Sequence, residues 1–355
     1  MTVNKVIKVG LIGLGGMADA HRRMISELYQ LQLSALCDVN DELLNKVGEE
    51  EGIGEEKRFT EMESLIQDPT VDAVISIVPN DLHAKVLELC IHHQKPIMAE
   101  KPFTLNFKEA EYLAELYEKT PIPCMVGFSY RYIPAFRYAK QLLAENKIGT
   151  LRHIEVRYLQ SFGAPIFDVP YLWRFNKVVT GTGALGDLGA HMIDSARFLV
   201  GEFKSVSALM RTFVPERRDP ASGTMHKVEV DDYVSFHAVL EHDVVGTFLT
   251  TRNAIGSGNQ HEVTLYGDIG TINVNCEKPD EVRLSFIHNK ELQTSTETLE
   301  VPPGYRRQQL EDFTVLVTGQ EHDGIPDFHD GYQNQKVLER IIESAEKSQS
   351  VNIDE

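Results

Sequence analysis

The segment Val9–Ala18, VGLIGLGGMA, joins an apolar run to a stretch of helical spacing over residues 17–30. Within it, Gly13, Gly15 and Ala18 follow the spacing G-x-G-x-x-A. In this pattern the first glycine allows a tight turn, the second lets backbone N–H groups approach a pyrophosphate, and the third small residue lets the helix pack on the strand. The segment therefore predicts a dinucleotide-binding turn, against the alternative of an ordinary strand-to-helix turn. The cofactor-binding residues expected here are Gly13, Gly15, Gly16, Met17 and Ala18.

A second apolar run ends at Asp38, about 25 residues after Gly13. This is close to the spacing of the acidic residue that hydrogen-bonds an adenosine ribose. A carboxylate there would repel a 2′-phosphate, and the two residues that follow supply no arginine to bind one. The sequence therefore favours NAD over NADP. The alternative is that Asp38 or Asp41 only caps a helix over 42–50.

The run Ala73–Val78, AVISIV, is continuous and apolar, as expected for an interior parallel strand that is covered on both faces. It ends in Pro79 and Asn80, and His83 follows at the start of a helix. Residues at the carboxyl ends of such strands line the ligand crevice, so we predict these three as neighbours of the nicotinamide or its ribose. For His83 alone, a polar residue in the first turn of a surface helix is the simpler interpretation.

The next apolar run ends in Glu100, Lys101 and Pro102. Because the proline restricts the backbone directly after Lys101, this strand end is expected to hold the ammonium group near the crevice. A helix over 107–119 and a strand over 124–128 follow. The alternation of strands and helices predicts an α/β domain with a doubly wound parallel sheet of the Rossmann type.

From about residue 127 the pattern changes to strands separated by short turns, which imply antiparallel pairing. We predict an NAD-binding Rossmann domain over 1–126 and an α+β domain over 127–355, with a large, mainly antiparallel open sheet, for substrate binding and oligomerisation. The C-terminal helices can pack back on the first domain. The polar loop 214–227 is either a lid or a surface excursion. The expected strands are 204–211, 232–240, 244–250, 262–266, 271–275 and 281–287, and the closing helices are 305–318 and 327–346.

The pattern GALGDLGAHMID places Asp187 and His191 four residues apart on an expected helix over 187–199, with Asp194 three residues further. Residues at this spacing share one face of an α-helix. Oxidation of a secondary alcohol needs a base for the hydroxyl proton, and histidine titrates near the working pH. A lysine such as Lys101 would stabilise the developing alkoxide, and Asp187 would orient the imidazole or bind a substrate hydroxyl.

Each of these side chains also has a simpler interpretation. Asp187 could cap the helix, His191 could be a hydrogen-bonded core histidine, and Lys101 could be a surface charge. Together with a dinucleotide site, however, the three supply a base, a cation and an orienting carboxylate. A catalytically silent NAD-binding sensor or regulatory protein has no need to keep this set. A metal-dependent hydrolase using His191, Asp187 and Asp194 is weaker, because three side chains on one helix rarely converge on a metal without further ligands.

Composition excludes other classes. Acidic residues outnumber basic ones by 53 to 35, and the formal charge of −18 opposes binding to nucleic acid or an anionic membrane. No apolar segment approaches the roughly 20 residues of a membrane span, and the N-terminus lacks the features of a signal peptide. The four cysteines form no C-x-x-C pair, so we expect reduced thiols and no metal site. A cytoplasmic protein is therefore expected.

These motifs resemble the Gfo/Idh/MocA oxidoreductases, the group of glucose-fructose oxidoreductase and inositol dehydrogenase, over essentially the whole chain. The segment before Asp187 departs mildly from the family pattern, with Thr182 where a glycine is common. The matching elements are GLGGMA, Pro79-Asn80 with His83, Glu100-Lys101-Pro102, Arg131 in YRY, Trp173-Arg174, and the stretch Gly183 to His191.

The resemblance implies that Lys101, Asp187 and His191 are catalytic, with either His191 or a lysine-assisted relay as the base. It implies NAD as cofactor, a sugar, inositol or related polyol as substrate, and a homodimer or homotetramer assembled through the exposed face of the C-terminal sheet. It also implies that Glu100, Lys101 and Arg131 border the nicotinamide and that Tyr130, Trp173 and Arg174 lie near the substrate or the cofactor.

Overall fold

The computed structural model describes residues 6–288, 293–320 and 323–354. The chain divides into two compact units: unit 1 comprises Met1–Gly127 and Gln308–Tyr332, and unit 2 comprises Phe128–Arg307 and Gln333–Glu355. Helix α10 (Phe328–Lys347) therefore begins in unit 1 and continues in unit 2. It is 20 residues long and carries charged residues along its length. No helix within the described ranges is long and apolar enough to cross a membrane.

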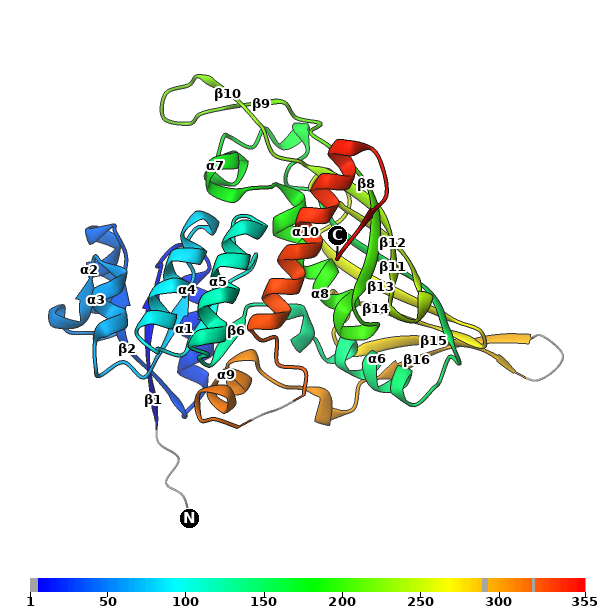
Figure 1. Cartoon of the computed structure of the whole chain (residues 1–355), viewed down its shortest axis with the longest axis horizontal. Helices are drawn as coiled ribbons and strands as arrows, with labels where there is room; N and C mark the ends of the chain where they lie inside the picture. Colours follow the sequence, from blue (N-terminus) through cyan, green and yellow to red (C-terminus); the bar gives the residue numbers. More distant parts are fainter. Residues whose placement is uncertain (1–5, 289–292, 321–322, 355) are drawn as a thin grey trace, which may run out of the picture. The chain divides into compact units, whose positions relative to one another are not determined.

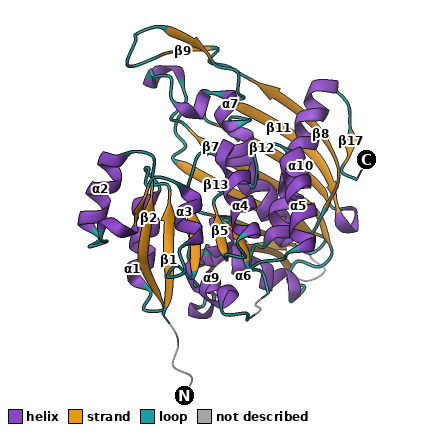
Figure 2. Ribbon diagram, turned by 60° about the vertical axis from the view of Figure 1, so that its left-hand side comes forward, coloured by secondary structure: helices purple, strands orange, loops and turns teal. Residues whose placement is uncertain are grey.

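Unit 1 is built on six parallel strands in the order β3-β2-β1-β4-β5-β6 (Figure 2). This is the doubly wound order of a Rossmann fold, so the predicted class of this half is confirmed. The strands are β1 (Ile7–Ile12), β2 (Leu31–Cys37), β3 (Arg58–Phe59), β4 (Ala73–Ser76), β5 (Ile97–Ala99) and β6 (Cys124–Val126), and the helices are α1 (Ala18–Glu27), α2 (Asp41–Glu50), α3 (Met62–Gln67), α4 (His83–His92), α5 (Phe107–Lys119) and α9 (Gln309–Val317).

The C-terminal part of unit 1 packs beside its last strand. The backbone N–H of Val126 donates to Pro326 O at 2.9 Å. The ring of Phe328 stacks on Tyr117 with centroids 3.9 Å apart and meets Phe103 edge-on at 5.0 Å. These aromatic contacts bury the first turn of α10 against the Rossmann sheet and its helix α5.

Unit 2 is built on a nine-stranded sheet in the order β16-β15-β14-β13-β7-β12-β11-β8-β17 (Figure 1). Neighbouring strands are antiparallel except β7 and β12, which are parallel, so the predicted mainly antiparallel sheet is confirmed. The strands are β7 (Leu151–Gln160), β8 (Phe203–Arg211), β11 (Tyr233–Leu240), β12 (Val245–Thr251), β13 (Asn259–Gly267), β14 (Gly270–Asn275), β15 (Glu281–His288), β16 (Gln293–Glu300) and β17 (Val351–Asn352).

Helices cover one face of this sheet. Helices α6 (Pro134–Ala144) and α8 (Ala190–Leu199) pack on each other, α6 against β14 and β15, and α8 against β7. Asn334 of α10 donates from Nδ2 to Ala190 O at 2.8 Å and so holds α10 against α8.

The expected single α-helix over 187–199 is wrong at its start. Leu185–Gly189 forms a π-helical turn, η6, and the α-helix begins only at Ala190. Asp187 lies in the middle of this turn and is not the N-cap of α8. Since a π turn closes over more residues than an α turn, the one-turn spacing expected between Asp187 and His191 does not apply.

The polar loop 214–227 contains a two-stranded hairpin, β9 (Glu216–Arg218) with β10 (Met225–Lys227), which extends at the top of Figure 1. The sequence also missed β16, because it is almost entirely polar and exposed. Both stretches lack the alternating apolar pattern that marks a half-buried strand.

A buried ion pair joins the 3₁₀ turn η3 (Ser129–Tyr132) to α8. The Arg131 guanidinium donates to the Asp194 carboxylate, with Nε 2.9 Å and Nη2 2.6 Å from Oδ1. The two residues are only 4% and 0% exposed. Two hydrogen bonds from one planar guanidinium fix the orientation of both side chains.

Arg131→Met should lower the free energy of unfolding by about 3–5 kcal/mol, because it leaves a buried carboxylate without its counterion. The matched control is Arg157→Met, which removes an arginine that is 51% exposed and paired with Glu262, and should cost less than about 1 kcal/mol. Urea unfolding followed by circular dichroism measures both. Equal losses for the two variants would contradict the structural role of the buried pair.

Candidate functional site

The glycine turn of unit 1 needs Gly13 for two reasons. Its φ of +90° is a conformation that L-residues rarely adopt, and a Cβ there would lie 2.6 Å from Ile77 O at the end of β4. The Gly13 N–H also donates to Cys37 O at 2.9 Å. The turn is therefore pressed against the carboxyl ends of both strands that flank β1.

Gly15 and Gly16 have the opposite surroundings. A Cβ added to either would have no described atom within 4 Å, so the backbone of this turn faces open space at the start of α1. Ala18 is only 1% exposed, and its N–H donates to Gly15 O at 2.8 Å. Bare backbone at the N-terminus of a ten-residue helix suits the pyrophosphate of a dinucleotide.

Asp38 faces this turn. Its Oδ2 accepts a hydrogen bond from Leu14 N at 2.7 Å, and its Oδ1 accepts from Asn40 N at 2.9 Å. The alternative that Asp38 or Asp41 caps α2 is wrong, because the N-cap is Asn40, whose side chain accepts from Leu43 N. The partly exposed Asp38 carboxylate thus lies beside the glycine turn, where the ribose of a dinucleotide is expected.

Pro79 and Asn80 lie at the start of the 3₁₀ turn η2 (Asn80–Leu82), after the end of β4. His83 is buried, so its interpretation as a residue of a surface helix is wrong. Its Nδ1 is 2.6 Å from Pro102 O and its Nε2 is 3.0 Å from Val78 O. Burial lowers the pKa of His83. The ring thus bridges the chain after β4 and the chain after β5.

Glu100 and Lys101 follow β5, and the Lys101–Pro102 peptide bond is cis. Glu100 Oε1 is 3.0 Å from Nε2 of His21 on α1, and its Oε2 accepts from Lys101 N at 3.3 Å. Burial opposes ionisation of Glu100, but the hydrogen bond from His21 and the nearby charge of Lys101 hold the pKa of Glu100 below its usual value. The Glu100 carboxylate is therefore held by His21 and by the Lys101 backbone, and the charge of Lys101 acts on it.

In unit 2, Asp187 is held by Arg252, a residue that the sequence analysis missed. Arg252 Nη2 donates to Asp187 Oδ2 at 2.8 Å; the arginine side chain is 2% exposed and the aspartate side chain is 31% exposed. Arg252 follows β12 and lies 65 residues from Asp187 in the chain, so no local pattern links the two. The carboxylate is fixed and also reaches the surface.

His191 lies in an aromatic cluster. Its ring meets Tyr130 edge-on with centroids 4.7 Å apart, and it is 6% exposed. The Tyr130 hydroxyl is 2.5 Å from the Tyr158 hydroxyl, and Asn259 Nδ2 donates to Tyr130 at 3.0 Å. Burial raises the pKa of Tyr130 to about 12 and that of Tyr158 still further, so both phenols stay protonated at neutral pH. Tyr158 and Asn259 were not predicted.

The remaining candidates have contacts of their own. The guanidinium of Arg131, predicted beside the nicotinamide, is buried on Asp194, so Asp194 does not join Asp187. Trp173 is 45% exposed, and the Arg174 guanidinium lies 4.5 Å from its ring centroid. No cluster of three or more potential metal ligands occurs among the described residues. Cys37, Cys90 and Cys124 are buried free thiols, and Cys276 is a partly buried one.

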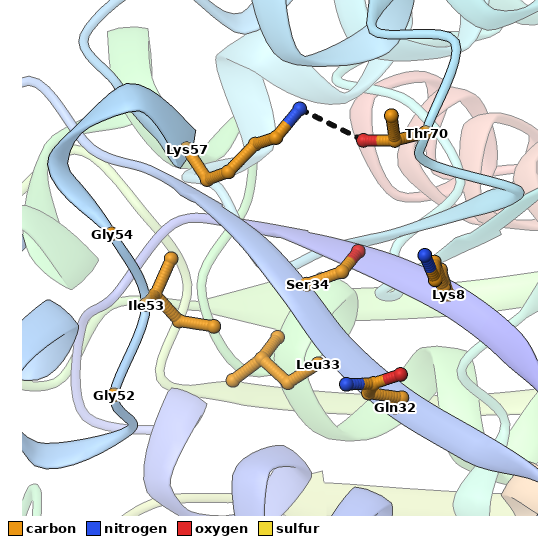
Figure 3. Close-up of a pocket in the computed structure, with 9 residues that line it drawn as sticks. All are labelled: Lys8, Gln32, Leu33, Ser34, Gly52, Ile53, Gly54, Lys57 and Thr70. Carbon is orange, nitrogen blue, oxygen red and sulfur yellow. Dashed lines mark hydrogen bonds between the residues drawn. The ribbon is translucent and has the colours of Figure 1, made fainter.

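A cavity of about 270 Å³ lies near the amino ends of β1 and β2. Figure 3 shows the side chains that line it. Lys57 reaches across its rim and donates to Thr70 Oγ1 at 2.8 Å. The predicted cofactor residues follow the opposite, carboxyl ends of these strands, so this cavity is separate from the candidate site. Its lining residues are Lys8, Gln32, Leu33, Ser34, Gly52, Ile53, Gly54, Lys57 and Thr70.

Comparison with known proteins decides the family. Residues 7–128 match the family model described as the oxidoreductase family with an NAD-binding Rossmann fold, and residues 136–273 match the GFO/IDH/MocA C-terminal domain. The chain belongs to the Gfo/Idh/MocA oxidoreductases. As a member of this family it is an oxidoreductase with an NAD-binding Rossmann domain, and the predicted family and NAD-binding domain are confirmed.

Similar proteins of this family cover almost the whole chain. A levoglucosan dehydrogenase of Pseudarthrobacter phenanthrenivorans is 30% identical over 98% of both chains. A glucose-6-phosphate 3-dehydrogenase of Bacillus subtilis is 25% identical over 98% of both. A solved structure of levoglucosan dehydrogenase in complex with NADH and L-sorbose has a TM-score of 0.89 and 31% identity, covering 98% of this chain and 99% of the other.

Two glycine variants test the dinucleotide turn. Gly13→Ala should lower the free energy of unfolding by about 1–3 kcal/mol, because it strains the backbone and meets Ile77 O. Gly15→Ala should change stability by less than about 1 kcal/mol but weaken NADH binding at least about tenfold, since its methyl group stands where the pyrophosphate approaches. Thermal unfolding and calorimetric titration with NADH measure these effects. Unchanged NADH affinity in Gly15→Ala would contradict the site.

Proposed function

We propose that this enzyme oxidises a secondary alcohol of a sugar or cyclitol with NAD. The observation that carries the proposal is the arrangement in unit 2: a fixed, partly exposed Asp187 carboxylate on the same segment as His191, whose ring packs on Tyr130. Lys101 of unit 1 follows β5, the strand after the one that meets the glycine turn. These are the groups that proton removal from an alcohol requires.

Each side chain has a definite role in this proposal. NAD, when bound, accepts the hydride that leaves the carbinol carbon. His191 takes the hydroxyl proton, either directly or through Lys101. The Lys101 ammonium stabilises the developing alkoxide and lowers the pKa of the alcohol, while Asp187 orients the imidazole or binds a neighbouring hydroxyl. Glu100 accepts a hydrogen bond from the Lys101 backbone N–H and so helps to fix the strand end that carries this lysine.

The names of similar proteins support a carbohydrate substrate and leave two chemical classes to compare, neutral sugars and sugar phosphates. The polar cluster of Tyr130, Tyr158 and Asn259 supports a neutral polyol, because it offers uncharged donors and acceptors beside His191. The two tyrosines are buried and Asn259 is exposed, so the cluster reaches the surface, where polar groups discriminate by pairing with substrate hydroxyls.

With NAD and a panel of inositols, aldoses, levoglucosan, sugar acids and sugar phosphates, the wild type should form NADH with at least one neutral member. On that substrate, Lys101→Ala and His191→Ala should each lower kcat about 100-fold or more, because each removes a group that handles the proton. NADH binding should change little. Steady-state absorbance assays and titration with NADH measure both. Turnover like that of the wild type in either variant would remove that residue from the mechanism.

We further propose that Asp38 selects NAD against NADP. Asp38→Asn keeps an oxygen for the Leu14 N–H and removes the negative charge. The preference for NADH over NADPH should fall at least about fivefold, because two like charges about 4 Å apart repel by about 1 kcal/mol even in water. Calorimetric titration with each nucleotide measures the ratio of the Kd values. Equal affinities in the wild type would contradict the role of Asp38.

A further inference from the structure

The segment that carries Asp187 is held by a second aspartate, Asp231, which precedes β11. Asp231 is 6% exposed. Its Oδ1 accepts from Gly183 N at 2.7 Å, its Oδ2 accepts from Leu185 N at 2.8 Å, and its backbone oxygen accepts from Ala184 N at 2.9 Å. Three consecutive N–H groups at the entrance of the π turn are therefore bound by one residue.

Arg252 completes this arrangement from the end of β12. Its Nη2 donates both to Gly183 O, at 3.1 Å, and to Asp187 Oδ2, at 2.8 Å. One nitrogen thus joins the backbone before the π turn to the carboxylate within it. The positive charge of Arg252 also acts on the Asp231 carboxyl group.

The backbone has little room to move in this assembly. A Cβ on Gly183 would lie 1.7 Å from Asp231 O, so only glycine allows so close an approach. Asp187 N donates to Gly183 O at 3.2 Å, which is the same oxygen that Arg252 contacts. The register of the π turn, and with it the direction of the Asp187 side chain, is set by contacts from the sheet.

A second buried arginine of unit 2, Arg217, offers a comparison because it donates hydrogen bonds to backbone oxygens. Arg217 donates to the backbone oxygens of Val169 and Gly163 at 2.9 and 2.6 Å, and lies 4.2 Å from the Phe175 ring centroid. Arg252 leaves Nε and Nη1 without a hydrogen-bond partner among the described residues, as Arg217 leaves its Nε. The side-chain group that it does hydrogen-bond is the Asp187 carboxylate.

We propose that Arg252 and Asp231 are positioning residues of the reaction, which hold the Asp187 carboxylate in a fixed direction from the π turn. This inference rests on the proposed function, because it assumes that Asp187 takes part in the reaction. It adds a role for two residues outside the Lys101, Asp187 and His191 set. Arg252 acts through Asp187 and needs no contact with the substrate.

The charged and titratable groups around Asp187 come from several elements. Arg252 contacts it from the end of β12, and Tyr158 of β7 feels its charge. Asp231 and Arg217 face Arg252 in turn. Because Tyr158 stays protonated and uncharged at neutral pH, Arg252 is the positively charged group among these contacts to Asp187.

Three variants test the proposal: Arg252→Met, Arg252→Lys, and Arg217→Met as the matched control for loss of a buried guanidinium. The first readout is the pKa of Asp187, measured by carbon-13 NMR on protein whose aspartates are labelled at the side-chain carboxyl carbon. The Asp187 signal is identified by its absence in Asp187→Asn. The second is the pH profile of kcat on the best substrate. In Arg252→Met, the Asp187 pKa and the acid limb of kcat should both rise by about 1–3 units. Arg252→Lys should show a smaller rise, and Arg217→Met none.

The outcomes separate this inference from the proposed function. An unchanged Asp187 pKa in both Arg252 variants would overturn the positioning role, whatever the activity. A raised Asp187 pKa with an unmoved acid limb would overturn the link between Asp187 and the reaction. If no sugar is oxidised, the proposed function fails, while the carboxyl titration still decides whether Arg252 holds Asp187. If Arg252→Met does not fold, Arg252→Lys carries the test.

Discussion

The pairing of buried charge governs the arrangement of unit 2. Two carboxylates seven residues apart in one segment each pair with an arginine, Asp187 with Arg252 and Asp194 with Arg131. An unpaired charge as deeply buried as that of Asp194 costs several kcal/mol, so the Arg131 pair stabilises the segment, and Arg252 fixes the partly exposed Asp187. His191 lies between these two aspartates in the chain, and its ring packs edge-on against Tyr130.

In unit 1 the main structural requirement is a different one: the backbone of the glycine turn must allow a dinucleotide to approach closely. Glycine is required at position 13 because a Cβ there would meet Ile77 O, whereas Gly15 and Gly16 leave bare backbone facing open space. Asp38 ties the turn to the end of β2 through Leu14. Gly13 packs tightly against the neighbouring strand end, whereas Gly15 and Gly16 face open space. One short sequence therefore both joins the strand to the helix and leaves backbone accessible for a ligand.

Local patterns predicted most of the fold and the candidate residues, and long-range contacts explain what they missed. The apolar run before Asn80 and the spacing around Gly13 identified β4 and the turn, because both signals lie within a few residues. The π turn was missed because its register depends on Asp231. Arg252 and Asn259 were missed because their partners lie far away in the chain, and β16 because it buries little apolar surface.

Direct transfer of deuterium tests the central claim. A substrate from the panel that carries deuterium on the reacting carbinol carbon is incubated with the enzyme and NAD, and the reduced nucleotide is analysed by mass spectrometry. The account predicts that each reduced nucleotide formed carries one deuterium, because hydrogen passes from that carbon to the nicotinamide without exchange with water. Reduced nucleotide without the label, or none from any sugar or cyclitol, would contradict it.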